Sequence, residues 1–327
     1  MATTALRLGI DLGGTKTLGV LLDAKGTVVA EHKVETPASV GYAGTITHLA
    51  KVAAEVCAKG GLNAADRKRL PAIGLGLPGP VDPDRGVVLR AVNLGWKVPQ
   101  FIGKDLAQAF GLRVVLGNDV NFGALGEVMH GAATGAKTAC AAFVGTGFGG
   151  ALIRDGHVVN GSHGIAGELG HLRAPWGNAR CGCGNRGCLE TVCSKRGIAR
   201  QLLKAHIEGE HCEIPRKKLV HLKSSQLKQA LKEGCPATRR AVRTASEALG
   251  WGLAAFGAVA DPQVYIVGGG VIEALHKRML PVVLATMAKQ CVFFQGRQVD
   301  LRRAMLGDHA VAVGAAAATG LKEHTRW

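Results

Sequence analysis

Short apolar runs separated by glycine-containing turns form the pattern of the first 35 residues. Residues 6–12, 17–23 and 27–34 are rich in branched apolar side chains, and the turns between them contain Gly13-Gly14 and Ala24-Lys25-Gly26. Runs of this length that are bounded by glycine predict β-strands joined as a hairpin or meander. The chain is therefore expected to begin with a small antiparallel sheet.

The same arrangement returns about 130 residues later. A strand is expected at 141–144, a glycine-rich turn at 145–150, and a hairpin made of 151–154 and 157–160. The segment LLDAKGTVV at 21–29 is similar to LIRDGHVV at 152–159. A unit that occurs twice indicates a duplicated α/β domain with a cleft between its halves.

Apolar residues at helical spacing predict the other elements. We expect helices at 44–59, at about 120–130, through most of 195–260 with breaks near 215 and 234–236, and at 310–321. Further strands are expected at 72–77, 113–116 and 263–267. Residues 1–117 are expected to form a small α/β domain, completed by a C-terminal helix of about 306–327 that packs back on it. Residues 118–305 are expected to form a larger α/β domain that contains the cysteine-rich loop at 181–188.

Composition narrows the class of protein. A length of 327 residues is sufficient for two domains, and 47% hydrophobic residues exclude a disordered chain. No apolar run is long enough to span a bilayer, and Asp11 follows too soon for a signal peptide. The nine cysteines are an odd number, and six of them are scattered. We therefore expect a cytoplasmic protein without a membrane partner.

The formal charge of +16 is distributed unevenly. Residues 191–243 contain 13 Lys or Arg against four Glu. Such a stretch can bind nucleic acid or polyphosphate, and it can equally be the solvated helical face of a basic protein that binds anionic substrates. Composition alone leaves both interpretations open.

Three cysteines and a histidine form the most specific cluster in the chain. Cys181, Cys183 and Cys188 follow the spacing C-x-C-x4-C, and His171 lies ten residues upstream. Three thiolates and an imidazole are a ligand set typical of tetrahedral Zn²⁺. Because the protein fills all four positions, we expect a structural zinc that braces its loop. Loss of a cysteine is expected to disturb this loop and to leave the glycine turns at 13–16 and 145–147 intact.

Two glycine turns that follow apolar strands are candidate phosphate sites. Glycines let successive backbone N–H groups turn toward a phosphate, and Thr or Lys adds a further donor. The residues concerned are Asp11, Gly13, Gly14, Thr15 and Lys16 in the first turn, and Gly145, Thr146 and Gly147 in the second. Gly269 and Gly270 follow a third strand and could admit a nucleotide base or ribose. Ordinary hairpin and helix-packing turns are the alternative for each.

Several polar residues are candidates for catalysis and for binding a polyol. Asp119 lies where a strand meets a helix, so it is either a helix N-cap or a general base. Glu168 and His171 are three residues apart, and Glu190 flanks the cysteine cluster. Hydroxyl groups of a sugar need such partners in a dry site. Asn93 lies beside Trp96 in NLGW, a pairing that is also common in protein cores.

Taken together, these motifs resemble the repressor–ORF–kinase (ROK) family of sugar kinases. The resemblance covers nearly the whole chain and rests on DLGGTK at 11–16, GLPGPVD at 76–82, NLGW at 93–96, GNDVNFGALGE at 117–127, VGTGFGG at 144–150, GxxGExGH at 164–171, CGCGNRGCLE at 181–190 and GGG at 268–270. It implies a duplicated actin-like, hexokinase-type (ribonuclease H-like) α/β fold with two domains around a cleft. It also implies a homodimer or homotetramer.

The resemblance further implies a glucokinase that uses ATP and Mg²⁺, with Asp119 as the catalytic base. The implied sugar contacts are Asn93, Asn118, Asp119, Glu168, His171 and Glu190, and the implied zinc ligands are His171, Cys181, Cys183 and Cys188. The implied phosphate contacts are Gly13, Gly14, Thr15, Thr146 and Gly147.

Three alternatives remain open from the sequence. Fructose, mannose and an N-acetyl amino sugar are alternative acceptors to glucose, and polyphosphate is an alternative donor. A non-catalytic sugar sensor or nucleic-acid-binding regulator is a different class. Repressors of the family carry a helix-turn-helix before the first phosphate loop, which here begins at Asp11. We therefore expect a kinase without a nucleic-acid partner.

Overall fold

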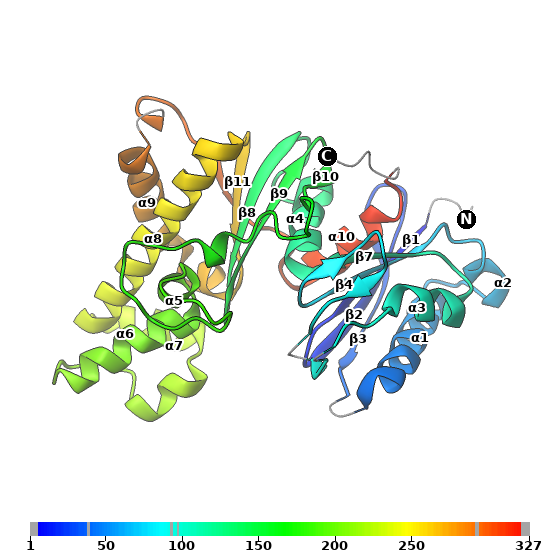
Figure 1. Cartoon of the computed structure of the whole chain (residues 1–327), viewed down its shortest axis with the longest axis horizontal. Coiled ribbons are helices and arrows are strands. Elements are labelled where there is room, and N and C mark those ends of the chain that lie inside the picture. The colour runs from blue at the N-terminus through cyan, green and yellow to red at the C-terminus, as the bar shows by residue number, and fades with distance from the viewer. Residues whose placement is uncertain (1–5, 38–39, 92–93, 97, 292–293, 322–327) are drawn as a thin grey trace. The chain divides into compact units, whose positions relative to one another are not determined.

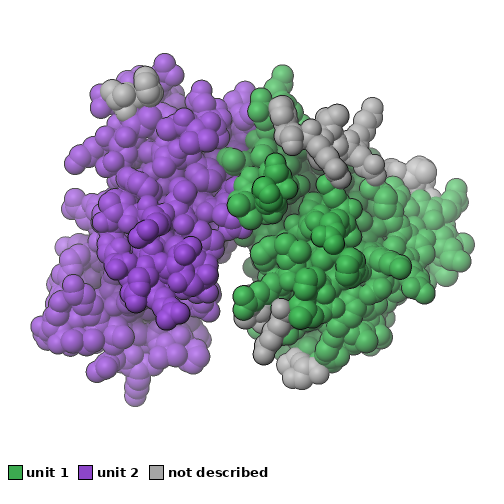
Figure 2. Space-filling view, viewed as in Figure 1, with its two compact units in different colours: residues 1–137, 152–166, 305–327 green, residues 138–151, 167–304 purple. Residues whose placement is uncertain are grey.

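The computed structural model describes residues 6–37, 40–91, 94–96, 98–291 and 294–321 (Figure 1). Contacts divide the chain into two compact units, which Figure 2 colours separately. The first unit comprises Met1–Lys137, Leu152–Ala166 and Met305–Trp327, and the second comprises Thr138–Ala151 and Gly167–Ala304.

The first sheet has five strands in the order β3-β2-β1-β4-β7. Strands β1, β2 and β3 are antiparallel neighbours, as expected, whereas β4 and β7 run parallel to β1. The strands are β1 (Arg7–Leu12), β2 (Lys16–Leu22), β3 (Val28–Glu35), β4 (Ile73–Leu77) and β7 (Val114–Asn118). A separate pair of short strands is formed by β5 (Val81–Asp82) and β6 (Val87–Val88).

The second sheet repeats this order as β10-β9-β8-β11-β12. Strands β8, β9 and β10 are antiparallel neighbours, and β11 and β12 run parallel to β8. The strands are β8 (Thr138–Val144), β9 (Phe148–Arg154), β10 (His157–Val158), β11 (Val264–Gly268) and β12 (Leu301–Arg303). The matching order and strand directions confirm the duplication that the repeated strand–turn–hairpin unit predicts.

Helices cover both faces of the first sheet. One face packs Leu8, Ile10 and Leu12 with apolar residues of α1, and the other packs Leu18 and Val20 with small residues of α10. The helices of this unit are α1 (Gly41–Lys59), α2 (Ala64–Arg67), α3 (Ile102–Phe110), α4 (Asp119–His130) and α10 (Ala310–Ala318), with the 3₁₀ turn η6 (Gly307–His309). The closing helix therefore lies on the first sheet, as expected, although it ends three residues before 321.

Glycines allow α10 to lie unusually close to its neighbours. A Cβ on Gly74 would collide with the backbone carbonyl of Ala315, and a Cβ on Gly314 would collide with the carbonyl of Phe122 in α4. Because α4 packs tightly on α10, it belongs to the first unit. This division differs from the expected boundary after residue 117, which assigned α4 to the second domain.

The second unit is mainly helical outside its sheet. Its helices are α5 (Glu190–Cys193), α6 (Lys195–Ile207), α7 (Ser224–Lys232), α8 (Pro236–Ala260) and α9 (Gly270–Gln290), with the 3₁₀ turns η3 (Leu169–His171) and η4 (Arg216–His221). The helical region breaks near Pro215 and before Pro236, as expected, because proline is favoured at the start of a helix. Among the described residues, no helix is long and apolar enough to cross a lipid bilayer.

The glycine turn of the second sheet is shorter than the expected 145–150. Strand β9 already begins at Phe148, so Gly149 and Gly150 are strand residues. A Cβ on Gly150 would lie 2.6 Å from the carbonyl oxygen of Gly167. These glycines therefore serve the close packing of β9 against the segment 167–170.

Candidate functional site

Two carboxylates lie at the same edge of the first sheet. Asp11 in β1 is opposite Gly76 in β4, and Gly76 is opposite Gly117 in β7. Asp119 follows β7 directly as the first residue of α4. Burial and the nearby charges of Asp119 and Asp308 raise the pKa of Asp11 to about 7. The carboxyl ends of parallel strands are the usual ligand edge of an α/β sheet.

Asn118, and not Asp119, caps helix α4. The Oδ1 atom of Asn118 accepts the N–H of Val120 at 2.9 Å and that of Asn121 at 3.3 Å. Its Nδ2 donates to the carbonyl of Gly79 at 3.1 Å. The interpretation of Asp119 as the N-cap is therefore wrong, because the preceding side chain satisfies the first N–H groups of the helix.

The carboxylate of Asp119 has only local support. Its Oδ1 accepts the N–H of Val120 at 2.9 Å. Burial raises the pKa of Asp119, and this hydrogen bond offsets part of the effect. A carboxylate whose pKa is raised binds a proton more readily than an ordinary carboxylate, which suits a general base.

The first glycine turn connects β1 to β2 and exposes its tip. The N–H of Gly13 donates to the carbonyl of Lys16 at 2.9 Å, and a Cβ on Gly13 would lie 2.9 Å from that oxygen. The hydroxyl of Thr36 donates to the carbonyl of Gly13 at 2.7 Å. Gly14, Thr15 and Lys16 are exposed. Hydrogen bonds thus hold the base of the turn, while Gly14, Thr15 and Lys16 are exposed to solvent.

The second glycine turn is fixed in a similar way within its own unit. Gly145 donates its N–H to the carbonyl of Gly147 at 3.0 Å, and its carbonyl accepts the N–H of Lys195 at 2.9 Å. Thr146 is exposed at the tip. Gly269 has φ +83°, and a Cβ on it would lie 2.6 Å from the carbonyl oxygen of Val144. The turn and the start of α9 at Gly270 therefore lie at the same edge of the second sheet.

His171, Cys181, Cys183 and Cys188 converge on one point. One ligand atom from each residue lies within 4.8 Å of all the others. The Sγ atoms of Cys183 and Cys188 are 3.7 Å apart, and Nδ1 of His171 is 3.8 Å from Sγ of Cys181. Four donors at these separations fit around a single tetrahedral ion. The chain thus brings together a Cys/His cluster that can hold a metal.

Glu190 connects this cluster to the second glycine turn, a link that the sequence did not reveal. Its Oε1 accepts the thiol of Cys181 at 3.4 Å, and its Oε2 accepts the N–H of Phe148 at 3.0 Å. A Cβ on Gly147 would lie 2.7 Å from the same Oε2. The carboxylate at the start of α5 therefore touches both the metal cluster and the turn.

Glu168 and His171 lie together, as their spacing predicts. Nε2 of His171 is 3.8 Å from Oε2 of Glu168, so Nδ1 is the nitrogen that faces the cysteines. Glu168 is exposed and His171 is partly buried. Asn93 lies outside the described residues. The other expected site residues fall into two groups, one in each unit. Those at 11–16, 118 and 119 belong to the first unit, and those at 145–147, 168–190, 269 and 270 belong to the second.

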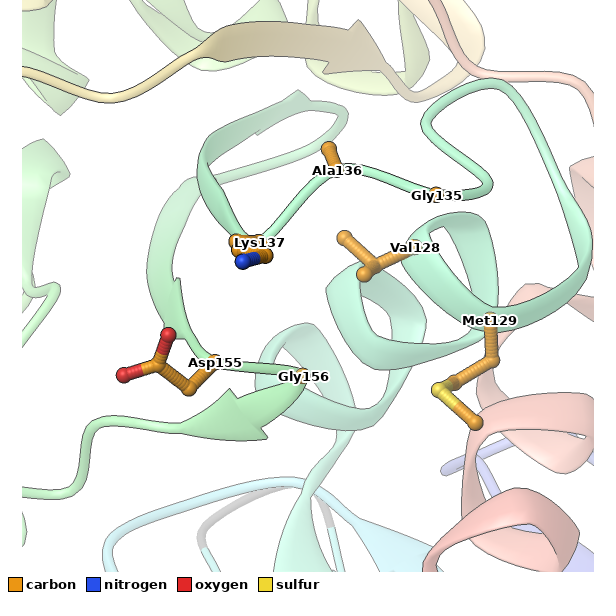
Figure 3. Close-up of a pocket in the computed structure, with 7 residues that line it drawn as sticks. All are labelled: Val128, Met129, Gly135, Ala136, Lys137, Asp155 and Gly156. Carbon is orange, nitrogen blue, oxygen red and sulfur yellow. The ribbon is translucent and has the colours of Figure 1, made fainter.

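A pocket of about 440 Å³ in the first unit is not part of this arrangement (Figure 3). It is lined by the end of α4, by residues 135–137 and by the turn between β9 and β10. None of the expected site residues lines it. Its wall is mostly apolar, with the side chains of Lys137 and Asp155 near each other on one side of it.

Comparison with known proteins identifies the family of this chain. A family model described as the ROK family matches residues 7–320. This chain belongs to the ROK family. It is 33% identical over 279 residues to a glucokinase of Halalkalibacterium halodurans, covering 84% of this chain and 83% of the relative. It is 32% identical over 297 residues to an N-acetyl-D-glucosamine kinase of Vibrio cholerae, covering 86% and 91%.

Solved structures of ROK proteins share the fold. A ROK hexokinase from Thermus thermophilus has a TM-score of 0.81 and 32% identity, covering 95% of this chain and 96% of that chain. A ROK glucokinase from Streptomyces griseus in complex with glucose and AMPPNP has a TM-score of 0.76 and 29% identity, covering 96% and 98%. These matches confirm the predictions of the ROK family, of the duplicated actin-like fold and of a sugar kinase.

Proposed function

We propose that this ROK kinase transfers the γ-phosphoryl group of ATP to glucose and forms glucose 6-phosphate. The proposal rests on one observation at the start of α4. Asn118 is the N-cap of this helix, so the neighbouring Asp119 carboxylate is not needed as the cap and can act as a base. The Streptomyces griseus relative, which binds glucose and AMPPNP, supports the choice of sugar and donor.

In the proposed reaction, Asp119 accepts the proton of the sugar hydroxyl while that oxygen attacks the γ-phosphorus. The bond between the γ-phosphorus and the β–γ bridging oxygen breaks, and ADP leaves. Phosphoryl transfer of this kind depends mainly on positioning and on electrostatic stabilisation. We assign positioning of the phosphates to the backbone N–H groups and side chains of the two glycine turns, at 13–16 and 145–147. Gly269 and Gly270 would accept the nucleoside part of ATP against bare backbone.

Asp11 suits a site that receives Mg²⁺ together with ATP. Its pKa of about 7 shows that a full negative charge is unfavourable at that place. A divalent cation neutralises charge on the phosphates and on nearby carboxylates. Asp11 would therefore hold the cation, directly or through water, and would become fully ionised when it does so.

The Cys/His cluster would hold a structural Zn²⁺. Three thiolates and Nδ1 of His171 fit this ion, which supplies cross-linking and no open position for catalysis. The cluster would fix the loop that carries His171 and Glu190. We propose that these two residues, with Asn93, Asn118, Asp119 and Glu168, contact the sugar. A cytoplasmic homodimer or homotetramer remains our expectation for this kinase.

The decisive experiment measures ADP formation for a matrix of sugars and donors, with metal analysis of the purified protein. We expect glucose with ATP to give the highest kcat/KM, and about one zinc per chain. The relative named as an N-acetyl-D-glucosamine kinase makes that sugar the second candidate acceptor. Polyphosphate in place of ATP tests the alternative donor, and absence of any sugar-dependent product would leave the idle sensor as the function.

A further inference from the structure

Glu127 is an unusual charged residue in this chain. Its exposed fraction is 0%, and no other acidic or basic residue within the described ranges is as buried. It lies in the last turn of α4, which starts at Asp119. An ionised carboxylate without access to water needs strong hydrogen-bond donors. Neither the sequence motifs nor the proposed reaction assigns Glu127 a role.

Three backbone N–H groups satisfy this carboxylate. Oε2 accepts the N–H of Ala132 at 2.8 Å. Oε1 accepts the N–H of Met305 at 2.9 Å and that of Leu306 at 2.8 Å. A Cβ on Gly131 would collide with the same carboxylate, so glycine leaves the room that this geometry needs. Charge-assisted bonds of this kind are shorter and stronger than neutral ones.

The donors belong to two segments that connect the units. The chain passes between the units at four places, after residues 137, 151, 166 and 304. The segment from Ala132 leads to the first of these places, and Met305 is the first residue after the last. One buried carboxylate therefore holds an outgoing and a returning segment at a single point inside the first unit.

The Glu127 carboxylate holds one end of each connecting segment, and this limits where the two segments can bend. Hinges are a few loop or terminal residues that absorb changes in φ and ψ while their surroundings stay rigid. With Ala132, Met305 and Leu306 tied to α4, these two segments can bend only beyond the anchor, at residues 133–137 and near Ala304. The crossings after residues 151 and 166 are not held by Glu127. The same helix carries Asp119 at its other end, so the anchor and the proposed base share one rigid element.

We propose that the two units move relative to each other during phosphoryl transfer, and that Glu127 is a positioning residue that anchors the hinge of this movement. This inference rests on the proposed function. Glu127 touches neither substrate nor reacting atoms. Its carboxylate keeps the two connecting segments fixed to α4. When the sugar binds, the two units therefore close in one defined movement.

The test compares Glu127→Gln with Thr45→Val. Glutamine keeps the volume, but its one oxygen can accept from only one segment, while its NH₂ group faces N–H donors on the other. Thr45 is also buried in the first unit and bonds only the carbonyl of Gly41 in its own helix, at 2.8 Å. Each variant is assayed for Tm, for glucose KM and kcat, and for the glucose-induced change in radius of gyration by small-angle scattering.

We expect Glu127→Gln to raise KM for glucose and lower kcat together, each by about fivefold or more, and to weaken the glucose-induced compaction. Thr45→Val should lower Tm without these changes. If both variants lower Tm and neither changes KM, kcat or compaction, Glu127 is only a stabilising residue and the proposal is wrong. A wild-type protein that phosphorylates glucose without any compaction would also overturn it. Absence of sugar phosphorylation by the wild type would instead remove the proposed function.

A second variant and a measurement on the wild type cover the case in which Glu127→Gln does not fold. Gly131→Ala pushes on the carboxylate and keeps its charge, and the same changes in KM, kcat and compaction are expected. In the wild type, hydrogen exchange at Ala132, Met305 and Leu306 should be slow and equal with and without glucose. Faster exchange there on adding glucose would contradict a fixed anchor.

Discussion

Replacing Asp11 with asparagine should make the folded protein more stable at neutral pH while impairing its use of Mg²⁺ and ATP. Burial and the charge of Asp119 raise the pKa of Asp11 from 3.8 to about 7. The folded protein therefore holds a proton on Asp11 over a range in which the unfolded chain has lost it. Asparagine has a similar shape and carries no charge, so it removes this penalty.

The size of the effect follows from the shift in pKa. The difference between about 7 and 3.8 is about three units, and each unit corresponds to roughly 1.36 kcal/mol. Because the folded-state pKa is the higher one, the stability of the wild type falls as pH rises from about 4 to about 7. The full penalty, at most about 4 kcal/mol, is present above pH 7. Asp11 keeps partial contact with solvent, so we expect about 2–4 kcal/mol.

Chemical denaturation at about pH 4 and about pH 8 measures this difference. Asp11→Asn should exceed the wild type in free energy of unfolding at the higher pH and match it at the lower one. Asp300→Asn is the control, because Asp300 is paired with Arg302 and is not among the charges that shift the pKa of Asp11. Added Mg²⁺ and ATP should narrow the difference by stabilising the wild type alone. An equal difference at both pH values would refute the reasoning.

Three further predictions concern the site and the packing around it. Asp119→Asn should lower kcat by roughly 10²–10⁴ and leave the fold intact; turnover equal to the wild type would exclude Asp119 as the base. Cys183→Ser should lose bound zinc, measured by elemental analysis, and should raise KM for both glucose and ATP, because Glu190 bonds the metal cluster and the second glycine turn. An unchanged KM for ATP would show that the loss of zinc does not reach the second glycine turn through Glu190. This second outcome is the one that the sequence alone led us to expect. Gly74→Ala should cost about 1–3 kcal/mol or more, because its Cβ would overlap the carbonyl of Ala315; a Tm equal to that of the wild type would contradict this close packing.

Local patterns were sufficient for most of the strands and for the duplication. The strands around residues 7–35 and the hairpin at 148–158 are marked by apolar runs and by glycine turns, which act over a few residues. Helix α9 was not expected, although it has 21 residues, because Pro281 lies inside it and its apolar pattern is weak. Strand β12 was missed because it has only three residues, whereas α3 was missed although its nine residues place apolar side chains at helical spacing and so carry a local signal.

The sequence by itself determined the family, the repeated strand–turn–hairpin unit and the four residues of the Cys/His cluster, because each depends on residue types at short, regular spacings. Only the tertiary structure decided that Asn118 caps α4, that Glu190 joins the metal cluster to the second glycine turn, and that Glu127 ties α4 to Met305. The contacts of Glu190 and Glu127 join carboxylates to backbone N–H groups from distant parts of the chain. The Asn118 cap is local, but Asn118 and Asp119 are adjacent polar residues, and only the structure shows which of them caps the helix. Every residue except proline carries a backbone N–H, so the residue type does not reveal which of these groups a distant carboxylate will bind, and packing decides it.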